Sequence, residues 1–208
     1  MPCYYDLTKN RQTNEETNET VETVQLDTSQ HYSEEYLTRA REANPNVKIV
    51  PRVYVHGMQG DVFFLASTKD EEWTRIMGFI EEIYANPHYQ GILFSSPFVT
   101  PNHKYPFSMK NFLKDIRAIA DKHGKMLIIG MDGVDPKPDQ KINKKKAREL
   151  IDIADKVVVA NYDCPRGNEG LNIPISPMDW VKQNYDFYCE VYSKSKITPK
   201  LIMVLLFL

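Results

Sequence analysis

The stretch that decides the fold is Tyr89-Gln90-Gly91-Ile92-Leu93-Phe94-Ser95-Ser96-Pro97. It is a short apolar run that ends in small polar residues and a proline, and a helical pattern lies on each side of it. In a barrel of alternating strands and helices, the residues at the carboxyl end of each strand face the ligand site. We therefore expect the end of this strand to decide between an enzyme and a non-enzyme.

Strand and helix patterns alternate along the chain. Apolar runs predict strands over residues 3–7, 47–55, 89–97, 126–131, 156–161 and 200–207. Amphipathic patterns predict helices that begin near residues 33, 68, 108, 143 and 176, the third of them capped by Ser108. Pro51 predicts a local irregularity in the second strand. Residues 8–30 are polar and lack periodicity, which predicts a surface loop or a disordered insert.

The order of these elements favours parallel βα units, because no hairpin turn joins two of the predicted strands. No strand is followed by a glycine-rich phosphate loop, which argues against the nucleotide-binding α/β folds. A (β/α)8 barrel needs eight strands and about 250 residues, whereas these 208 residues show six apolar runs. We predict an α/β fold, an incomplete TIM (β/α)8 barrel that forms one partial domain over residues 1–208. The apolar end Leu201–Leu208 favours a fragment.

Composition argues against several classes of function. A hydrophobic content of 42% and an aromatic content of 11% are typical of a globular protein. The net charge of −2 gives no electrostatic case for nucleic acid or a membrane as partner, and we interpret the basic cluster in Lys137–Arg148 as a solvated helix start. Cys3, Cys164 and Cys189 lack the spacing of a metal site or a disulfide framework, so we expect no metal and no cofactor. The first residues show no signal-peptide pattern.

Several segments carry a family resemblance through their order and spacing. They are Lys48–Arg52, Tyr89–Ile92, Asn161–Asp163, Leu171–Ile175 with Trp180, Met1–Leu7 and Leu201–Leu205. Together they resemble glycoside hydrolase family 18, the chitinase family. The resemblance implies a TIM barrel of which about strands two to seven are present. It also implies a secreted or lysosomal location.

The resemblance places the catalytic pattern of that family on the stretch quoted first. Active members carry Asp-Gly-x-Asp-x-Asp-x-Glu on the fourth strand, where the final Glu protonates the leaving oxygen and the preceding Asp orients the acetamido group of the substrate. The four acidic positions hold Gln90, Leu93, Ser95 and Pro97 in this sequence, and only Gly91 is kept. Since a general acid commonly contributes about 10²- to 10⁴-fold in rate, the substitutions predict a protein without hydrolase activity and without catalytic residues.

Four residues are candidate substrate ligands. The resemblance implies that Tyr162 and Asp163 match a Tyr-Asp pair that contacts the N-acetyl group and the adjacent hydroxyl, although Ala160 stands where the family has a methionine. Arg52, at the predicted end of its strand, is expected either to hydrogen-bond a sugar or to pair with a loop acid. Trp180 is expected either to stack on a sugar ring or to lie in the core.

The leading hypothesis is a chitinase-like protein that binds an oligosaccharide or chitin-like glycan without hydrolysing it. The alternative is a scaffold whose sugar cleft is vestigial and whose surface binds a protein partner. An active hydrolase with relocated carboxylates is a third reading. Asn18-Glu19-Thr20 is an acceptor pattern for N-glycosylation, meaningful only if the protein is secreted.

Overall fold

A computed structural model describes residues 4–13, 17–29, 33–55, 70–96, 99, 106–134, 144–161, 176–192 and 200–205. The chain divides into two compact units. The first contains Met1–Ser96 and Lys114–Leu127, and the second contains Pro97–Leu113 and Ile128–Leu208. Strands alternate with helices in both units, except that the first two strands of the chain follow one another directly.

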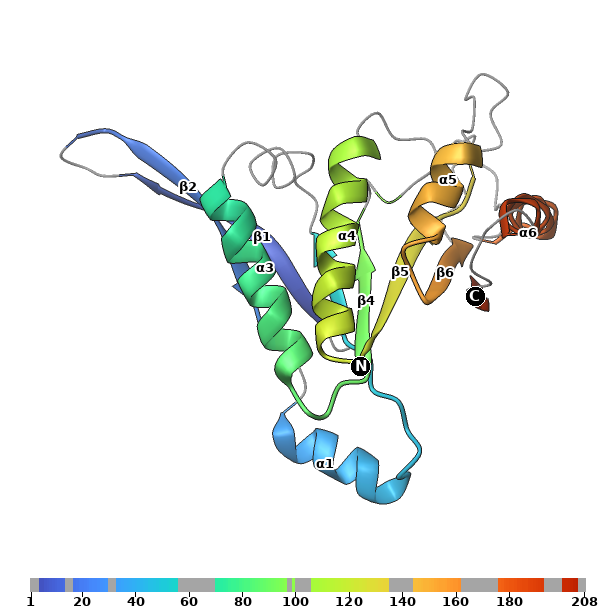
Figure 1. Cartoon of the computed structure of the whole chain (residues 1–208), viewed down its shortest axis with the longest axis horizontal. Helices are drawn as coiled ribbons and strands as arrows, with labels where there is room; N and C mark the ends of the chain where they lie inside the picture. Colours follow the sequence, from blue (N-terminus) through green and yellow to red (C-terminus); the bar gives the residue numbers. More distant parts are fainter. Residues whose placement is uncertain are drawn as a thin grey trace. The chain divides into compact units, whose positions relative to one another are not determined.

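The sheet of the first unit contains β1 (Tyr4–Thr13), β2 (Thr20–Asp27), β3 (Arg52–Val55) and β4 (Gly91–Ser95), in the order β2-β1-β3-β4. β1, β3 and β4 run parallel, as the sequence predicted. β2 is antiparallel to β1. Beyond the pair Leu7–Val55, β1 continues with β2 as a two-stranded ribbon (Figure 1).

The ribbon corrects the prediction of a loop or disordered insert over residues 8–30. Residues 8–13 and 20–27 are strands, paired from Asp6–Asp27 to Thr13–Thr20. The second of these strands contains two valines and two threonines, and β-branched residues favour strands whether or not they are apolar. The sequence-based prediction failed because it treated the threonines only as polar residues. Val24 is 1% exposed, so part of the ribbon is core.

The helices of this unit are α1 (Glu34–Ala43), α3 (Asp70–Ala85) and the second half of α4 (Pro106–Lys122). Ser33 caps α1 as predicted, and its Oγ accepts a hydrogen bond from the Tyr36 N–H at 3.3 Å. The predicted cap at Ser108 is wrong. α4 begins earlier, at Pro106, because the fixed φ of proline suits the first turn of a helix.

The predicted irregularity at Pro51 is confirmed. Ile49 makes an isolated bridge to Tyr89, and β3 begins only at Arg52. The Pro51 carbonyl still accepts a hydrogen bond from the Leu93 N–H at 2.9 Å. The predicted strand over residues 47–55 is therefore shorter, because proline has no N–H to donate to a ladder.

Glu72 of α3 anchors the ribbon to the helix. Its side chain is almost fully buried, Oε2 accepts a hydrogen bond from the Val24 N–H at 3.0 Å, and Oε1 lies 3.2 Å from Arg75 Nη1. Because β2 is the last strand in the order, this bond satisfies a donor on an open sheet edge.

We expect Glu72→Ala to weaken the attachment of the ribbon by about 2 kcal/mol, the contribution of a buried hydrogen bond to a charged group. If the ribbon opens locally, the Val24 amide should exchange with solvent about 30-fold faster, measured by NMR hydrogen exchange. Glu72→Gln is the matched control, since it keeps an oxygen that accepts the Val24 N–H. Equal exchange rates in the two variants would contradict the role of this bond.

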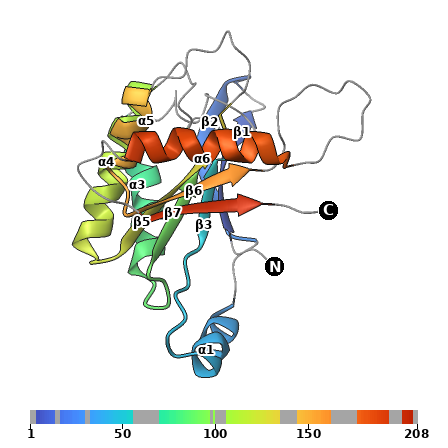
Figure 2. The same cartoon turned by 90° about the vertical axis from the view of Figure 1, so that its right-hand side faces the viewer.

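The second unit contains β6 (Lys156–Asn161), β7 (Lys200–Leu205) and most of β5 (Met126–Asp132), all parallel in the order β5-β6-β7. Its helices are α5 (Lys144–Ile151), α6 (Met178–Tyr192) and the first half of α4. Figure 2 shows α6 alongside β6. β6 has the predicted bounds, and its Val157 and Val159 are fully buried.

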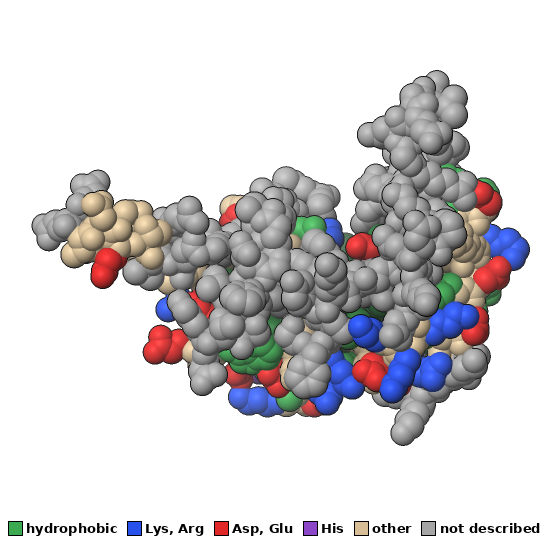
Figure 3. Space-filling view, turned by 90° about the horizontal axis from the view of Figure 1, so that it is seen from above, with side chains coloured by type: hydrophobic (Ala, Val, Ile, Leu, Met, Phe, Trp, Pro, Cys, Tyr) green, Lys and Arg blue, Asp and Glu red, His purple; other side chains and the backbone are tan. Residues whose placement is uncertain are grey.

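Salt bridges involve one lysine of the basic cluster, Lys144 of α5, and one acidic residue of the same helix, Glu149. Lys144 Nζ lies 2.5 Å from Glu190 of α6, and Lys110 of α4 lies 3.0 Å from Glu149. Acidic and basic side chains intermingle along this border of the described surface (Figure 3). This pattern agrees with the interpretation of the cluster as a solvated helix start.

Candidate functional site

The two faces of the sheet in the first unit differ in burial. On one face, side chains are 7% exposed or less; they include Tyr5, Leu7, Val53, Val55, Ile92 and Phe94. The alternating residues Asp6, Arg52, Tyr54 and Leu93 are half-buried. Because successive side chains of a strand point to opposite faces, these four residues share the face that lines the interior of a barrel.

The strand register collects three polar residues in one row of this interior face. Asp6 is paired with Tyr54, and Tyr54 is paired with Ser95. Arg52 lies one step back along β3, and its Nε–H donates a hydrogen bond to Ser95 Oγ at 2.6 Å. The Arg52 guanidinium carbon also lies 4.4 Å from the centroid of the Tyr54 ring. A charge-assisted hydrogen bond and a cation–π contact therefore fix the Arg52 side chain.

The described positions of the catalytic pattern carry no carboxyl. Gln90 precedes β4, where its Oε1 accepts a hydrogen bond from the Ile49 N–H at 2.7 Å and its Nε2 donates to the His88 carbonyl at 3.2 Å. Leu93 is half-buried, and Ser95 is bound to Arg52. Pro97 lies outside the described residues.

The placement of Arg52 at the end of its strand is wrong. Arg52 is the first residue of β3, because Pro51 interrupts the ladder just before it. Its long side chain nevertheless reaches Ser95, the last residue of β4. Among the described residues its polar contact is therefore a hydroxyl and not a loop acid.

Tyr162 and Asp163 lie outside the described residues, so their roles stay predictions. The residue before them, Asn161, ends β6 and is fully buried. Its Oδ1 accepts a hydrogen bond from Asn184 Nδ2 of α6 at 2.7 Å, and its carbonyl accepts one from the Ser176 hydroxyl. The chain is thus held in place where it leaves β6 toward the Tyr-Asp pair.

Trp180 is 1% exposed and lies in the core of the second unit. Its Nε1–H donates a hydrogen bond to the Val134 carbonyl at 2.8 Å. A Cβ at Gly133 would lie 2.4 Å from the Trp180 ring, so the indole packs directly against the backbone. Of the two roles open from the sequence, this burial favours the core, because a ring that stacks on a sugar needs an exposed face.

Comparison with known proteins gives matches to solved structures. No family model matches the sequence, and no curated protein matches it. A class V chitininase from Pseudomonas fluorescens Pf-5 aligns with 85% of this chain and 55% of its own, at a TM-score of 0.64 and 15% identity. The GH18 chitinase ChiB from Flavobacterium johnsoniae aligns with 81% of this chain and 52% of its own, at a TM-score of 0.56 and 15% identity.

A third match is the Group IV chitinase of Ostrinia furnacalis, solved in complex with allosamidin, with a TM-score of 0.54 and 17% identity. It aligns with 80% of this chain and 48% of its own. This chain has the fold of the family 18 chitinases. The prediction of an incomplete TIM barrel is confirmed, and the chain spans about half the length of these structures. A closer likeness to chitinase domain-containing protein 1, also suggested by the sequence, is not confirmed.

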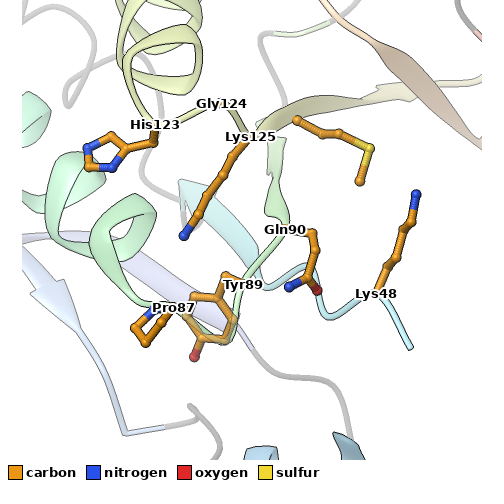
Figure 4. A pocket seen from close by; sticks show the side chains of 8 residues that line it. Lys48, Pro87, Tyr89, Gln90, His123, Gly124 and Lys125 are labelled. Carbon is orange, nitrogen blue, oxygen red and sulfur yellow. The ribbon is translucent and has the colours of Figure 1, made fainter. Parts of the chain in front are cut away.

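In the family 18 fold the site lies at the carboxyl ends of the strands, whereas a pocket of the first unit lies at their amino ends. It has a volume of about 380 Å³, and Figure 4 shows its lining residues Lys48, Pro87, Tyr89, Gln90, His123, Gly124, Lys125 and Met126. Lys125 Nζ donates hydrogen bonds to the carbonyls of Tyr84 and Asn86 at 2.5 and 2.6 Å. Burial, and then the charge of Arg41, lower the pKa of Lys125. This lysine caps the end of α3, which is a structural role.

Sequence reasoning missed Asp6 as a member of the interior row. The residue lies within a short strand prediction at the start of the chain, and no local pattern distinguishes it. Its relevance comes from the register, which sets Asp6 beside Tyr54. Tyr54 lies within β3, as the predicted strand over residues 47–55 implies, but the sequence did not link it to Asp6. The signal that would have found both is the alternation of buried and half-buried residues along paired strands.

Two kinds of feature are absent from the described residues. They contain no group of three or more His, Cys, Asp and Glu side chains placed to hold a metal ion. None of the described helices is both long enough and apolar enough to span a membrane.

Proposed function

We propose that this protein is a chitinase-like carbohydrate-binding protein without hydrolase activity, in a secreted or lysosomal setting. The observation that carries the proposal is the contact between Arg52 and Ser95 at the end of β4. At this position the resemblance places the carboxylate that orients the acetamido group of the substrate. A neutral hydroxyl held by a guanidinium neither accepts a proton at neutral pH nor supports a neighbouring general acid.

The same contact supports glycan binding. An arginine carries five N–H donors, and the bond to Ser95 uses one of them. The Tyr54 ring holds the guanidinium on the interior face, beside a row of polar groups from three strands. Fixed donors of this kind suit the hydroxyl and carbonyl oxygens of a sugar, because little conformational entropy is lost when the ligand binds. Tyr162 and Asp163 extend the proposed site.

Titration of the protein with chito-oligosaccharides tests this proposal by calorimetry. We expect binding without turnover of a chromogenic chitobioside. Arg52→Ala should weaken binding about tenfold or more, since a hydrogen bond to a charged group contributes about 1.5–3 kcal/mol. Lys48→Ala is the matched control. Lys48 is an exposed cation that precedes β3, the strand of Arg52, and it lines the pocket at the amino ends of the strands. Absence of binding at millimolar ligand would overturn the sugar-binding proposal.

The titration and the turnover assay together distinguish the two alternative functions. A scaffold with a vestigial cleft would bind no oligosaccharide and would require a protein partner. An active hydrolase with relocated carboxylates would turn over the chromogenic substrate, and Asp163→Asn or Asp6→Asn would abolish that turnover. Asp6 is included because its register sets it in the interior row.

A further inference from the structure

The tripeptide Asn18-Glu19-Thr20 is the one place in the 208-residue sequence where an asparagine is followed two positions later by Ser or Thr. None of the other twelve asparagines in the chain is followed by Ser or Thr in this way. An N-linked glycan added by the common sequence rule therefore has one possible attachment site. The proposed sugar-binding function makes no use of this segment. Its placement in the fold is therefore an independent observation.

The structure sets this tripeptide at the tip of the ribbon formed by β1 and β2. Thr13 and Thr20 form the last pair of the ladder, and their hydroxyl oxygens are 3.1 Å apart. Asn18 lies in the turn between the strands, with a φ of 54°, and residues 17–20 are all exposed. Asparagine adopts this left-handed conformation more readily than most residues. The acceptor side chain is therefore outside the ladder and outside the core.

The tip lies well away from the interior row. β1 leaves β3 after the Leu7–Val55 pair, and six further residues, 8–13, lead to the turn. At about 3.3 Å per residue, the ribbon extends roughly 20 Å beyond that pair. Figure 1 shows the two strands of the ribbon extending past α3, a helix of the same unit. A bulky substituent at Asn18 would displace neither the buried side chains nor the contact between Arg52 and Ser95.

We infer that Asn18 carries an N-linked oligosaccharide when the chain is made in the secretory pathway. The side-chain amide nitrogen attacks the anomeric carbon of an oligosaccharide linked to a lipid diphosphate. The new N–C bond replaces the bond from that carbon to the diphosphate oxygen, the lipid diphosphate leaves, and the amide gives up one proton. No oxidation or reduction takes place.

The glycan would also protect an open sheet edge. β2 is the last strand in the order, and Glu72 covers its edge at Val24. A sugar chain at Asn18 lies two residues before the start of the same strand. Its bulk obstructs the approach of a strand from another molecule, which is the usual hazard of an open edge.

The test is translation of the full chain behind a cleavable secretory leader, in the presence of microsomes. We expect a single increase in the apparent mass of the chain on gel electrophoresis, which an endoglycosidase reverses. Asn18→Gln and Thr20→Ala should abolish the shift, whereas Thr20→Ser should retain it, since Ser also completes the acceptor pattern. No shift of the wild-type chain beside a glycoprotein that does shift would overturn the inference, and so would a shift that persists in Asn18→Gln.

The readout does not depend on folding or on sugar binding, because transfer acts on the chain as it emerges into the microsome. A variant that fails to fold therefore still reports on the acceptor. Failure of the chito-oligosaccharide titration would leave this inference unaffected, and failure of glycosylation would leave the proposed function unaffected.

Discussion

Gly91→Ala is expected to destabilise the protein by about 3 kcal/mol, the upper part of the usual range for an inserted methyl group in a packed core. A Cβ at Gly91 would lie 2.2 Å from the Met126 carbonyl oxygen and 2.9 Å from its carbonyl carbon. Both are backbone atoms, so no side-chain rotation relieves the clash. The Met126 carbonyl accepts a hydrogen bond from the Tyr84 hydroxyl at 3.2 Å, and its N–H donates to the Gln90 carbonyl at 2.9 Å. A shift of Met126 strains both bonds.

Urea unfolding followed by far-UV circular dichroism measures this effect. Gly78→Ala is the matched control, because the glycine lies within α3 and a Cβ there would meet no atom within 4 Å. The same substitution should stabilise the protein by up to about 1 kcal/mol at that position, since alanine favours a helix. If the urea midpoint of Gly91→Ala equals that of the wild type, the close approach of β4 to Met126 is contradicted.

This prediction explains which position of the family pattern is kept in this chain. The resemblance places four acidic positions and one glycine on the stretch Tyr89–Pro97. Ser95, at one of these acidic positions, is hydrogen-bonded to Arg52. Gly91 is needed for close packing, because the backbone of Met126 occupies the space that a side chain would need. Packing therefore restricts position 91 whatever residues occupy the other positions of that pattern.

The elements that could be predicted from sequence are those whose signal is local. β6 has the predicted bounds because a run of three valines has no competing interpretation, and the cap of α1 follows from Ser33 and the acidic residues after it. The ribbon could not be predicted in the same way. Its threonines carry strand propensity but little hydrophobicity, so residues 8–30 show no periodicity.

The candidate site depends on contacts that no local pattern carries. Arg52 and Ser95 are 43 residues apart in sequence, and their hydrogen bond follows from the register of β3 on β4. Asp6 joins the row through the register of β1 on β3. A slip of one residue in either pair would turn these side chains to the other face. The sequence therefore indicated Arg52 as a candidate ligand, whereas its hydrogen-bond partner Ser95 could be identified only from the structure.

Asn184→Leu should cost about 3 kcal/mol of folding free energy, although the two side chains are similar in size. Asn184 is fully buried, its Oδ1 accepts a hydrogen bond from the Val134 N–H at 2.6 Å, and its Nδ2 donates to Asn161 Oδ1 at 2.7 Å. Leucine offers neither group, so two buried polar atoms lose this partner. Each such loss costs about 1–3 kcal/mol. Gln183→Leu is the matched control, since it makes the same kind of change at an exposed position of α6 and should alter stability by no more than about 0.5 kcal/mol.

The same substitution tests the link between packing and the proposed site. Asn161 precedes Tyr162, and Asn184 and Ser176 fix its side chain and its carbonyl. If Tyr162 and Asp163 contact a sugar, Asn184→Leu should weaken chito-oligosaccharide binding in protein that is still folded, and Gln183→Leu should not. Urea unfolding gives the first effect and calorimetric titration the second. Equal stability of the two leucine variants would show that the Asn161–Asn184 bond does not support the end of β6. A stability loss with unchanged affinity would instead remove Tyr162 and Asp163 from the proposed site.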